Sequence, residues 1–246
     1  MKANGKGPFT GRNYLVVGAS SGIGKATAHG LLEGGATVYA WNRRDDPDLA
    51  ARGICQARVD VTQSIEAASV DLPGELHGLV YAPGTINLAS FKRLSLETFR
   101  EDLEINFLGA VRTLQILQDH LLAAGASSDA SVVFFSTVAV ARGMAFHASV
   151  AAAKGAIEGF ARSMAAEYAQ RRVRFNVIAP SLTDTPLAAH LLGSEKKAQA
   201  AAERHPLRRT GAPDDIARAV LFLLDPANSW ITGQILGVDG GLGTLM

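Results

Sequence analysis

The sequence has a single cysteine, Cys55, in 246 residues, and only 19% of its residues are charged. One thiol excludes an intramolecular disulfide and any metal site built from several cysteines. The formal net charge of +1 gives no field that would attract nucleic acid or an anionic membrane, so neither partner is expected. Because the chain has a single cysteine, we expect a reducing, cytoplasmic setting.

Long hydrophobic runs are also missing. The densest apolar run near the C-terminus, residues 219–224, ends at Asp225-Pro226 and is far shorter than the ~20 apolar residues that a membrane-spanning helix needs. Residues 1–8 include basic residues and glycine, but no apolar stretch follows them as it would in a signal peptide. We expect residues 1–8 to form a loose tail.

Apolar residues make up 48% of the chain, enough for a sizeable core, and they form strand-like runs that alternate with helix-like segments. This alternation implies a parallel sheet covered on both faces. The expected fold is α/β: a single Rossmann-type doubly wound parallel sheet of about seven strands, in one domain of residues 1–246. We predict strands at 14–17, 37–41, 58–61, 78–81, 131–135, 173–179 and 234–238, and helices at 22–33, 96–123, 148–170 and 213–224.

A glycine-rich segment lies between the first predicted strand and the first predicted helix. Glycines let the backbone turn sharply and approach a diphosphate closely, and a helix N-terminus offers free N–H groups to the anion. The alternative is a purely structural glycine-rich turn between two packed elements. The surrounding strand, helix and second strand favour a dinucleotide site, formed by Gly18, Ser20, Ser21, Gly22, Ile23 and Gly24.

The Gly-x3-Gly-x-Gly spacing of this segment resembles that of the short-chain dehydrogenase/reductase family. The similarity extends over about residues 9–241 and is greatest to the 3-oxoacyl-[acyl-carrier-protein] reductase branch. It implies a small carbonyl or alcohol substrate, a nicotinamide cofactor and a homo-oligomer, either a tetramer or a dimer. The motifs that carry it are Asp60-Val61, Asn106-Phe107-Leu108-Gly109, residues 151–156 around Lys154, Asn176 to Pro180, and residues 231–241.

The resemblance also implies which residues contact the cofactor. Asp60 and Val61 correspond to the family's adenine contact, and Lys154 to the lysine that holds the nicotinamide ribose. The family's Asn-Ala-Gly appears as Ala82-Pro83-Gly84, which keeps the glycine and loses an amide that braces the loop. The other implied cofactor contacts are Thr183, through its backbone, and Thr185.

The end of the second predicted strand indicates which nicotinamide cofactor binds. A carboxylate there usually holds an unphosphorylated ribose, but this chain has Asn42 followed by Arg43. A guanidinium pairs well with phosphate, and in the family an arginine here accompanies NADP(H). We expect NADP(H), with Arg43 as a contact. The alternative is that Arg43 and Arg44 are solvated charges balanced by Asp45 and Asp46.

The resemblance implies a catalytic tyrosine four residues before Lys154, where this chain has Val150. Valine cannot donate a proton. The family's active-site hydroxyl corresponds to Thr137 and its supporting amide to Asn106, so Asn106, Thr137 and Lys154 are the candidate catalytic residues. Water, the substrate or His147 remain as proton sources, although His147 also fits a plain polar residue at a helix start.

Two functions therefore remain open from the sequence. The first is an NADP(H)-dependent oxidoreductase with an atypical active site. The second is a catalytically silent NADP(H)-binding protein that acts as a sensor or as a subunit of an assembly. In either case we expect residues 186–206 to form a segment that covers the substrate side of the site.

Overall fold

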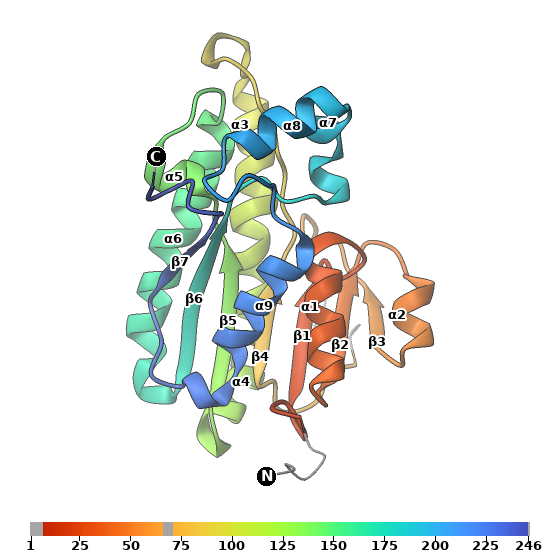
Figure 1. Ribbon diagram of the computed structural model, residues 1–246. Coiled ribbons are helices and arrows are strands. Elements are labelled where there is room, and N and C mark those ends of the chain that lie inside the picture. The colour runs from red at the N-terminus through yellow and green to blue at the C-terminus, as the bar shows by residue number, and fades with distance from the viewer. Residues whose placement is uncertain (1–6, 66–70, 246) are drawn as a thin grey trace.

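The sheet of the protein is parallel, with its seven strands in the order β3-β2-β1-β4-β5-β6-β7 (Figure 1). The computed structural model describes residues 7–65 and 71–245. The predicted doubly wound Rossmann-type fold is thus confirmed. The strands are β1 (Asn13–Val17), β2 (Thr37–Asn42), β3 (Cys55–Arg58), β4 (Gly78–Tyr81), β5 (Ala130–Phe135), β6 (Val173–Pro180) and β7 (Ile235–Val238).

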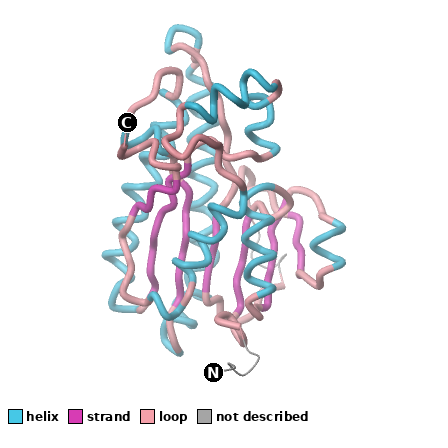
Figure 2. Tube along the Cα trace, viewed as in Figure 1, coloured by secondary structure: helices cyan, strands magenta, loops and turns pink. Residues whose placement is uncertain are grey.

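Helices cover both faces of this sheet, which forms the central layer in Figure 2. α1 (Gly22–Glu33) and α9 (Pro213–Leu224) pack together on one face, and α4 (Gly109–Ser127) and α6 (Ala148–Tyr168) pack on the other. The remaining α-helices are α2 (Pro47–Ala51), α3 (Leu96–Leu103), α5 (Val138–Arg142), α7 (Ala189–Leu192) and α8 (Glu195–Glu203). Shorter turns are η2 (Phe91–Arg93), the π-helical η3 (Glu104–Leu108), η4 (Ala169–Arg171), η5 (Pro186–Ala188) and η6 (Pro226–Asn228).

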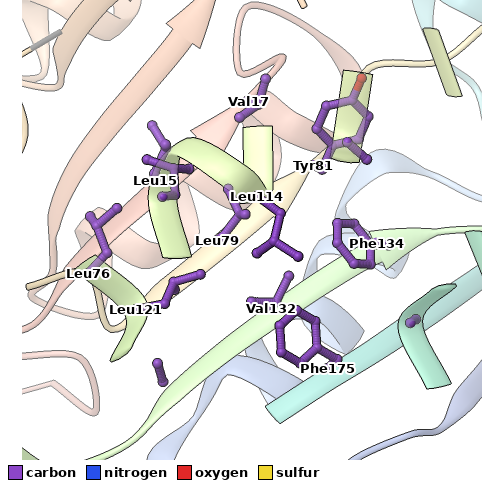
Figure 3. Packing of buried hydrophobic residues seen from close by; sticks show 14 of the residues in the cluster. Leu15, Val17, Leu76, Leu79, Tyr81, Leu114, Leu121, Val132, Phe134 and Phe175 are labelled. Carbon is purple, nitrogen blue, oxygen red and sulfur yellow. The ribbon is translucent and has the colours of Figure 1, made fainter. Parts of the chain in front are cut away.

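The uninterrupted apolar strands are explained by two hydrophobic clusters, one on each face of the sheet. Neighbouring residues of a strand point to opposite faces, so Leu15 and Val16 of β1 belong to different clusters. Figure 3 shows the cluster under α4 and α6, where Leu114 and Leu121 of α4 lie against Leu79 and other strand residues. Both faces are therefore dry, and polar chemistry is left to the ends of the strands.

The third strand lies earlier than predicted. It covers Cys55–Arg58 rather than residues 58–61, and it pairs with β2 from Cys55 opposite Tyr39 to Arg58 opposite Asn42. Beyond Arg58 the chain turns, because the Asp60 carboxylate accepts a hydrogen bond from the Thr62 N–H at 3.0 Å. The two valines that suggested a strand, at 59 and 61, are buried beyond its end.

The long helix predicted at 96–123 is wrong in its continuity and in its end. The structure has α3, the π-helical turn η3 and α4, which continues to Ser127. A π turn inserts an extra residue into the hydrogen-bond ladder and often marks a functional position, and this one contains Asn106. Helices α2 and α5 were not predicted, although Asp46 and Thr137 cap their N-termini.

In residues 7–65 and 71–245, no helix is both long enough and apolar enough to cross a membrane. Of the predicted loose tail, residues 1–6 lie outside the described residues. Phe9 is buried, and its N–H donates to the Gly34 carbonyl oxygen at 3.0 Å. The chain is therefore tied to the end of α1 directly after the predicted tail.

Candidate functional site

The carboxyl ends of the strands lie on one side of the sheet, at the top in Figure 1, where α3, α7 and α8 are also found. In parallel α/β sheets ligands bind in the crevice beyond these ends. The loops that follow β1 and β4 approach each other closely there. A Cβ built on Gly18 would lie 3.2 Å from Pro83 Cδ.

The turn from β1 into the first turn of α1 requires glycine at two positions. Gly18 has φ +78°, and its N–H donates to the Trp41 carbonyl oxygen at 2.8 Å. A Cβ on Gly24 would lie 2.2 Å from the Gly18 carbonyl oxygen, which no side chain tolerates. These glycines allow the loop to fold back tightly on the start of α1.

The N-terminus of α1 fits an anion. Ser21 occupies the N-cap position, but its hydroxyl makes no capping hydrogen bond, and Ser20 and Ser21 are both exposed. The first N–H groups of a helix have no partner within the helix, so they remain available to a phosphate. Thr185 adjoins the loop, since its Cγ2 lies 3.2 Å from where a Cβ on Gly22 would be.

Arg43, at the end of β2, has an exposed side chain. The two aspartates proposed as its alternative partners are engaged elsewhere. Asp45 pairs with Arg58 at 2.6 Å and Asp46 with Lys25 at 3.0 Å. The Arg43 charge is therefore not neutralised by these carboxylates, which favours the interpretation of Arg43 as a phosphate contact.

Asp60 and Val61 form a fixed edge beside this loop. Hydrogen bonds from Thr62 hold the pKa of the Asp60 carboxyl below its usual range, so it is an acceptor at neutral pH. Val61 is buried, and its carbonyl oxygen accepts a hydrogen bond from Arg112 Nε at 3.1 Å. The predicted adenine contact is thus anchored to α4.

Three of the predicted site residues meet beyond the end of β4. A Cβ built on Gly84 would lie 3.1 Å from Asn106 Oδ1 and 3.5 Å from Lys154 Nζ. Because Gly84 has no side chain, the amide of Asn106 on η3 and the ammonium of Lys154 on α6 can both lie next to it. The predicted catalytic residues Asn106 and Lys154, far apart in sequence, are brought together.

Lys154 is 8% exposed. Burial disfavours the charged ammonium and lowers the pKa of Lys154 to about 8, while the negative charge of Asp102 acts in the opposite direction. An amine with this pKa exists in both protonation states near neutral pH. Of the titratable groups beside Gly84, Lys154 is therefore the one whose pKa lies close to neutral pH.

A buried polar network around Asp102 escaped the sequence prediction. Asp102 is fully buried on α3, and its Oδ1 accepts a short hydrogen bond from Thr85 Oγ1 and another from Asn87 Nδ2 at 2.8 Å. Asn106 Nδ2 donates to Thr85 Oγ1 at 2.7 Å and to the Asp102 carbonyl oxygen at 2.8 Å. The network fixes the orientation of the Asn106 amide.

Val150 lies one helical turn before Lys154 and is 5% exposed. It brings no titratable group to the site. The neighbouring Ser149 is fully buried, and its hydroxyl has no partner among the described residues. His147 lies about 10 Å along the helix axis from Lys154, and its Nδ1 is 2.7 Å from the Ala145 carbonyl oxygen, so the geometry favours a helix-start role for it.

The two hydroxyls at the end of β5 have different partners. Thr137 Oγ1 accepts from the Ala139 N–H at 3.3 Å and caps α5, while the side chain stays partly exposed. Ser136 donates to Glu158 Oε1 at 2.6 Å and is buried. Thr137 keeps its hydroxyl proton available for an acceptor, whereas that of Ser136 is committed to Glu158.

The segment after β6 carries the two predicted threonines. Thr183 is buried, and its hydroxyl donates to the Ser181 carbonyl oxygen at 3.1 Å. Thr185 caps η5 by accepting from the Ala188 N–H at 3.3 Å. Ser181 Oγ also lies 2.8 Å from Nε2 of the buried His205, a contact not predicted from the sequence. This pair ties the chain following α8 to the end of β6.

Comparison with known proteins is consistent with this geometry. A family model described as enoyl-(acyl carrier protein) reductase matches residues 18–243. Cis-4-hydroxycyclohexanecarboxylate dehydrogenase of Sinomonas cyclohexanicum is 35% identical, with 95% of this chain and 97% of that protein covered. A 3-oxoacyl-[acyl-carrier-protein] reductase of Thermotoga maritima is 30% identical, with 94% and 98% covered. The chain belongs to the short-chain dehydrogenase/reductase family.

A solved structure is similar over nearly the whole chain. The gluconate 5-dehydrogenase of Burkholderia cenocepacia, in complex with NADP and tartrate, has a TM-score of 0.88 and is 26% identical. The alignment covers 97% of each chain. This protein therefore has the same overall fold as that dehydrogenase.

Proposed function

We propose that this protein is an NADP(H)-dependent oxidoreductase that interconverts a small carbonyl compound and its alcohol. The observation that carries the proposal is the meeting of Asn106 and the buried Lys154 beside Gly84, across from the glycine loop of β1. Similar proteins that are named as dehydrogenases and reductases, one of them solved with NADP, support it.

The proposed cofactor contacts follow the crevice in order. Gly18, Ser20, Ser21, Gly22, Ile23 and Gly24 would hold the diphosphate, because the loop is tight and the start of α1 lacks a side-chain cap. Arg43 would pair with the ribose phosphate, and Asp60 and Val61 would contact adenine. The nicotinamide end would be held by Gly84, Lys154, Thr183 and Thr185.

The bound nicotinamide supplies hydride to a carbonyl carbon or accepts it from an alcohol. The protein then has three tasks at the substrate oxygen. Thr137 orients the oxygen by a hydrogen bond, the Asn106 amide supports the neighbouring polar network, and Lys154 places a positive charge beside developing negative charge. Val150 closes one side of the site with an apolar surface and takes no part in proton transfer.

We further propose that the chain forms a single domain. Within it, residues 186–206, which include η5, α7 and α8, would cover the substrate. Exposed Leu187 would contribute an apolar wall to this cover. The segment is rich in alanine and leucine, which is compatible with a small, partly apolar carbonyl compound.

The first experiment measures cofactor uptake by calorimetry, with NADPH, NADP+ and NADH titrated separately into the protein. We expect NADPH and NADP+ to bind more tightly than NADH. A protein that takes up none of them would contradict the proposal.

The second experiment measures NADPH oxidation with a panel of small ketones, for the native chain and for Val150→Tyr. Activity in the native chain supports an oxidoreductase. Activity confined to Val150→Tyr, with NADPH binding intact in both, would instead identify a silent NADP(H)-binding protein. Ser149→Ala serves as a matched change at the adjacent position and is expected to leave NADPH binding unchanged.

A further inference from the structure

We propose that Lys154 itself donates and accepts the proton in this site, and that the buried carboxylate of Asp102 is the positioning residue that holds the lysine charge. The inference rests on the proposed oxidoreductase function and deepens it by naming the acid and base. It is carried by the geometry around Gly84 and by an unsatisfied carboxylate oxygen on α3.

The first step is the location of the titratable groups. Lys154 Nζ lies 3.5 Å from the place of a Cβ on Gly84, at the carboxyl end of β4. Val150 has no exchangeable side-chain proton, and Ser136 is bonded to Glu158. A substrate oxygen bound in the crevice beyond the strand ends would lie on the same side of the sheet as this ammonium.

The second step is the state of Asp102. Its Oδ1 has two donors, but its Oδ2 is buried and without a partner in the described part of the chain. A buried carboxylate oxygen without a donor is costly unless a positive charge compensates it. The negative charge of Asp102 favours the ammonium form of Lys154, against the larger effect of burial, so each of these two buried charges is stabilised by the other.

The third step concerns the other charges near Lys154. Those on α6 and on the elements packed against it are exposed or engaged elsewhere, which leaves Asp102 as the facing carboxylate. Glu101, Glu167 and Arg171 are exposed. The engaged groups are Glu97 with Arg100, Glu104 with Arg112, Glu158 with Ser136 and Arg162, Arg142 with the Leu242 carbonyl oxygen, and Arg174 with the Leu223 carbonyl oxygen.

The proton transfer balances as follows. In reduction, the carbonyl carbon receives a hydride from the reduced nicotinamide, the C=O π bond breaks, and the oxygen takes a proton from the Lys154 ammonium. The neutral amine then regains a proton from solvent. In oxidation, the neutral amine would remove the alcohol proton while the hydride passes from the carbon to the oxidised nicotinamide and the C=O π bond forms. The ammonium would then return its proton to solvent. A pKa of about 8 for Lys154 makes both forms accessible near neutral pH.

The direct test is the titration of Lys154 by NMR in protein labelled with 15N in its lysine side chains. The resonance is assigned by its loss in Lys154→Arg. We expect a midpoint near 8 in the native chain and a midpoint about 1 unit lower in Asp102→Asn, because an opposite charge that favours the ammonium has been removed. Glu101→Gln, an exposed neighbour on α3, is the control and should not shift the midpoint.

The pH profile of the reaction provides the second readout. Reduction requires the ammonium, so its rate should fall as pH rises through the lysine midpoint, whereas oxidation should gain rate over the same interval. Asp102→Asn should move both profiles to lower pH together with the NMR midpoint. Lys154→Arg keeps the positive charge but cannot release a proton, and we expect it to lose about 100-fold or more in turnover.

Three results would overturn the inference. One is a native midpoint at the ordinary lysine value of about 10.4, which needs no variant and decides the matter even if Asp102→Asn does not fold. Another is an Asp102→Asn variant that loses activity equally at every pH with no change in midpoint. The third is a Lys154→Arg variant with native turnover. NADPH binding is measured separately, so failure of the proposed function is distinguished from failure of this inference.

Discussion

Arg43 is the side chain that we propose to select the phosphorylated cofactor. Asp45 and Asp46 follow it in sequence, yet each is paired with a different base. The Arg43 guanidinium, exposed at the end of β2, is therefore not paired with either of these carboxylates. A planar guanidinium forms two parallel hydrogen bonds to a phosphate, which a bare ribose cannot accept.

We predict that Arg43→Ala weakens NADPH binding by about tenfold or more, since a lost charge-assisted hydrogen bond costs about 1.5–3 kcal/mol. NADH binding should change little, because it has no phosphate at that position. Dissociation constants from nucleotide fluorescence check both statements. Arg44→Ala, also exposed, is the matched control, and an equal loss in that variant would contradict the role of Arg43.

The site residues differ in how far the sequence could predict them. The glycine loop is formed by consecutive residues, so a short motif predicts it. Lys154 was likewise predicted from the short motif around it. Asp102 was not predicted because its hydrogen-bond donors, Thr85 and Asn87, come from a separate loop. An aspartate in an amphipathic helix is usually solvated, and nothing local in the sequence indicates that this one is buried.

At the scale of elements, capping and strand-end signals decided which predictions succeeded. α1, β4 and α9 begin and end where predicted, because glycine or proline marks at least one boundary of each. The third strand was misplaced because Val59 and Val61 are apolar without being in the sheet. The π turn η3 could not be predicted, since one extra residue in a helix leaves the apolar pattern nearly unchanged.

The N-terminus of α9 offers a test of capping. Asp215 Oδ2 accepts from the Ala212 N–H at 2.9 Å, and Arg209, with further help from that N–H, holds the pKa of the Asp215 carboxyl well below its usual range. A carboxyl with a depressed folded-state pKa stabilises the fold above its unfolded-state pKa of about 3.9 and loses this effect as pH falls through its folded-state pKa.

We predict that Asp215→Ala lowers the free energy of unfolding at pH 7 by about 1 kcal/mol. The difference from the native chain should shrink as pH is lowered below about 4, because the carboxyl of the unfolded chain is protonated there while that of the folded chain stays ionised until lower pH. Urea denaturation at several pH values measures this. A difference that stays constant down to pH 2 would show that the charge of Asp215 is not what stabilises α9.

At the scale of the whole molecule, the edge of the sheet at β7 is notably apolar. Trp230, shortly before β7, is 99% exposed, and Leu236 on β7 is 37% exposed. In a monomer, an indole left entirely in water contributes no hydrophobic stabilisation. An exposed apolar edge is typical of an interface. The homo-oligomer expected from the resemblance to the family would cover this edge.

We therefore predict self-association in solution, with Trp230→Ser weakening it by about tenfold or more, as expected for a large aromatic residue inside an interface. Sedimentation velocity over a range of concentrations measures the assembly. Leu96→Ser changes another exposed apolar residue, on α3, and should leave the assembly unchanged. A native chain that sediments as a monomer at every concentration would contradict the prediction.

The opposite edge of the sheet carries the one thiol of the chain. Cys55 is exposed at the start of β3, and β3 ends at Arg58, the ion-pair partner of Asp45 in the loop after Arg43. A maleimide dye will therefore attach at a single defined place, close to the proposed adenosine site, without any engineered mutation. We expect the emission intensity of this dye to change when a nucleotide binds and to recover when the nucleotide leaves.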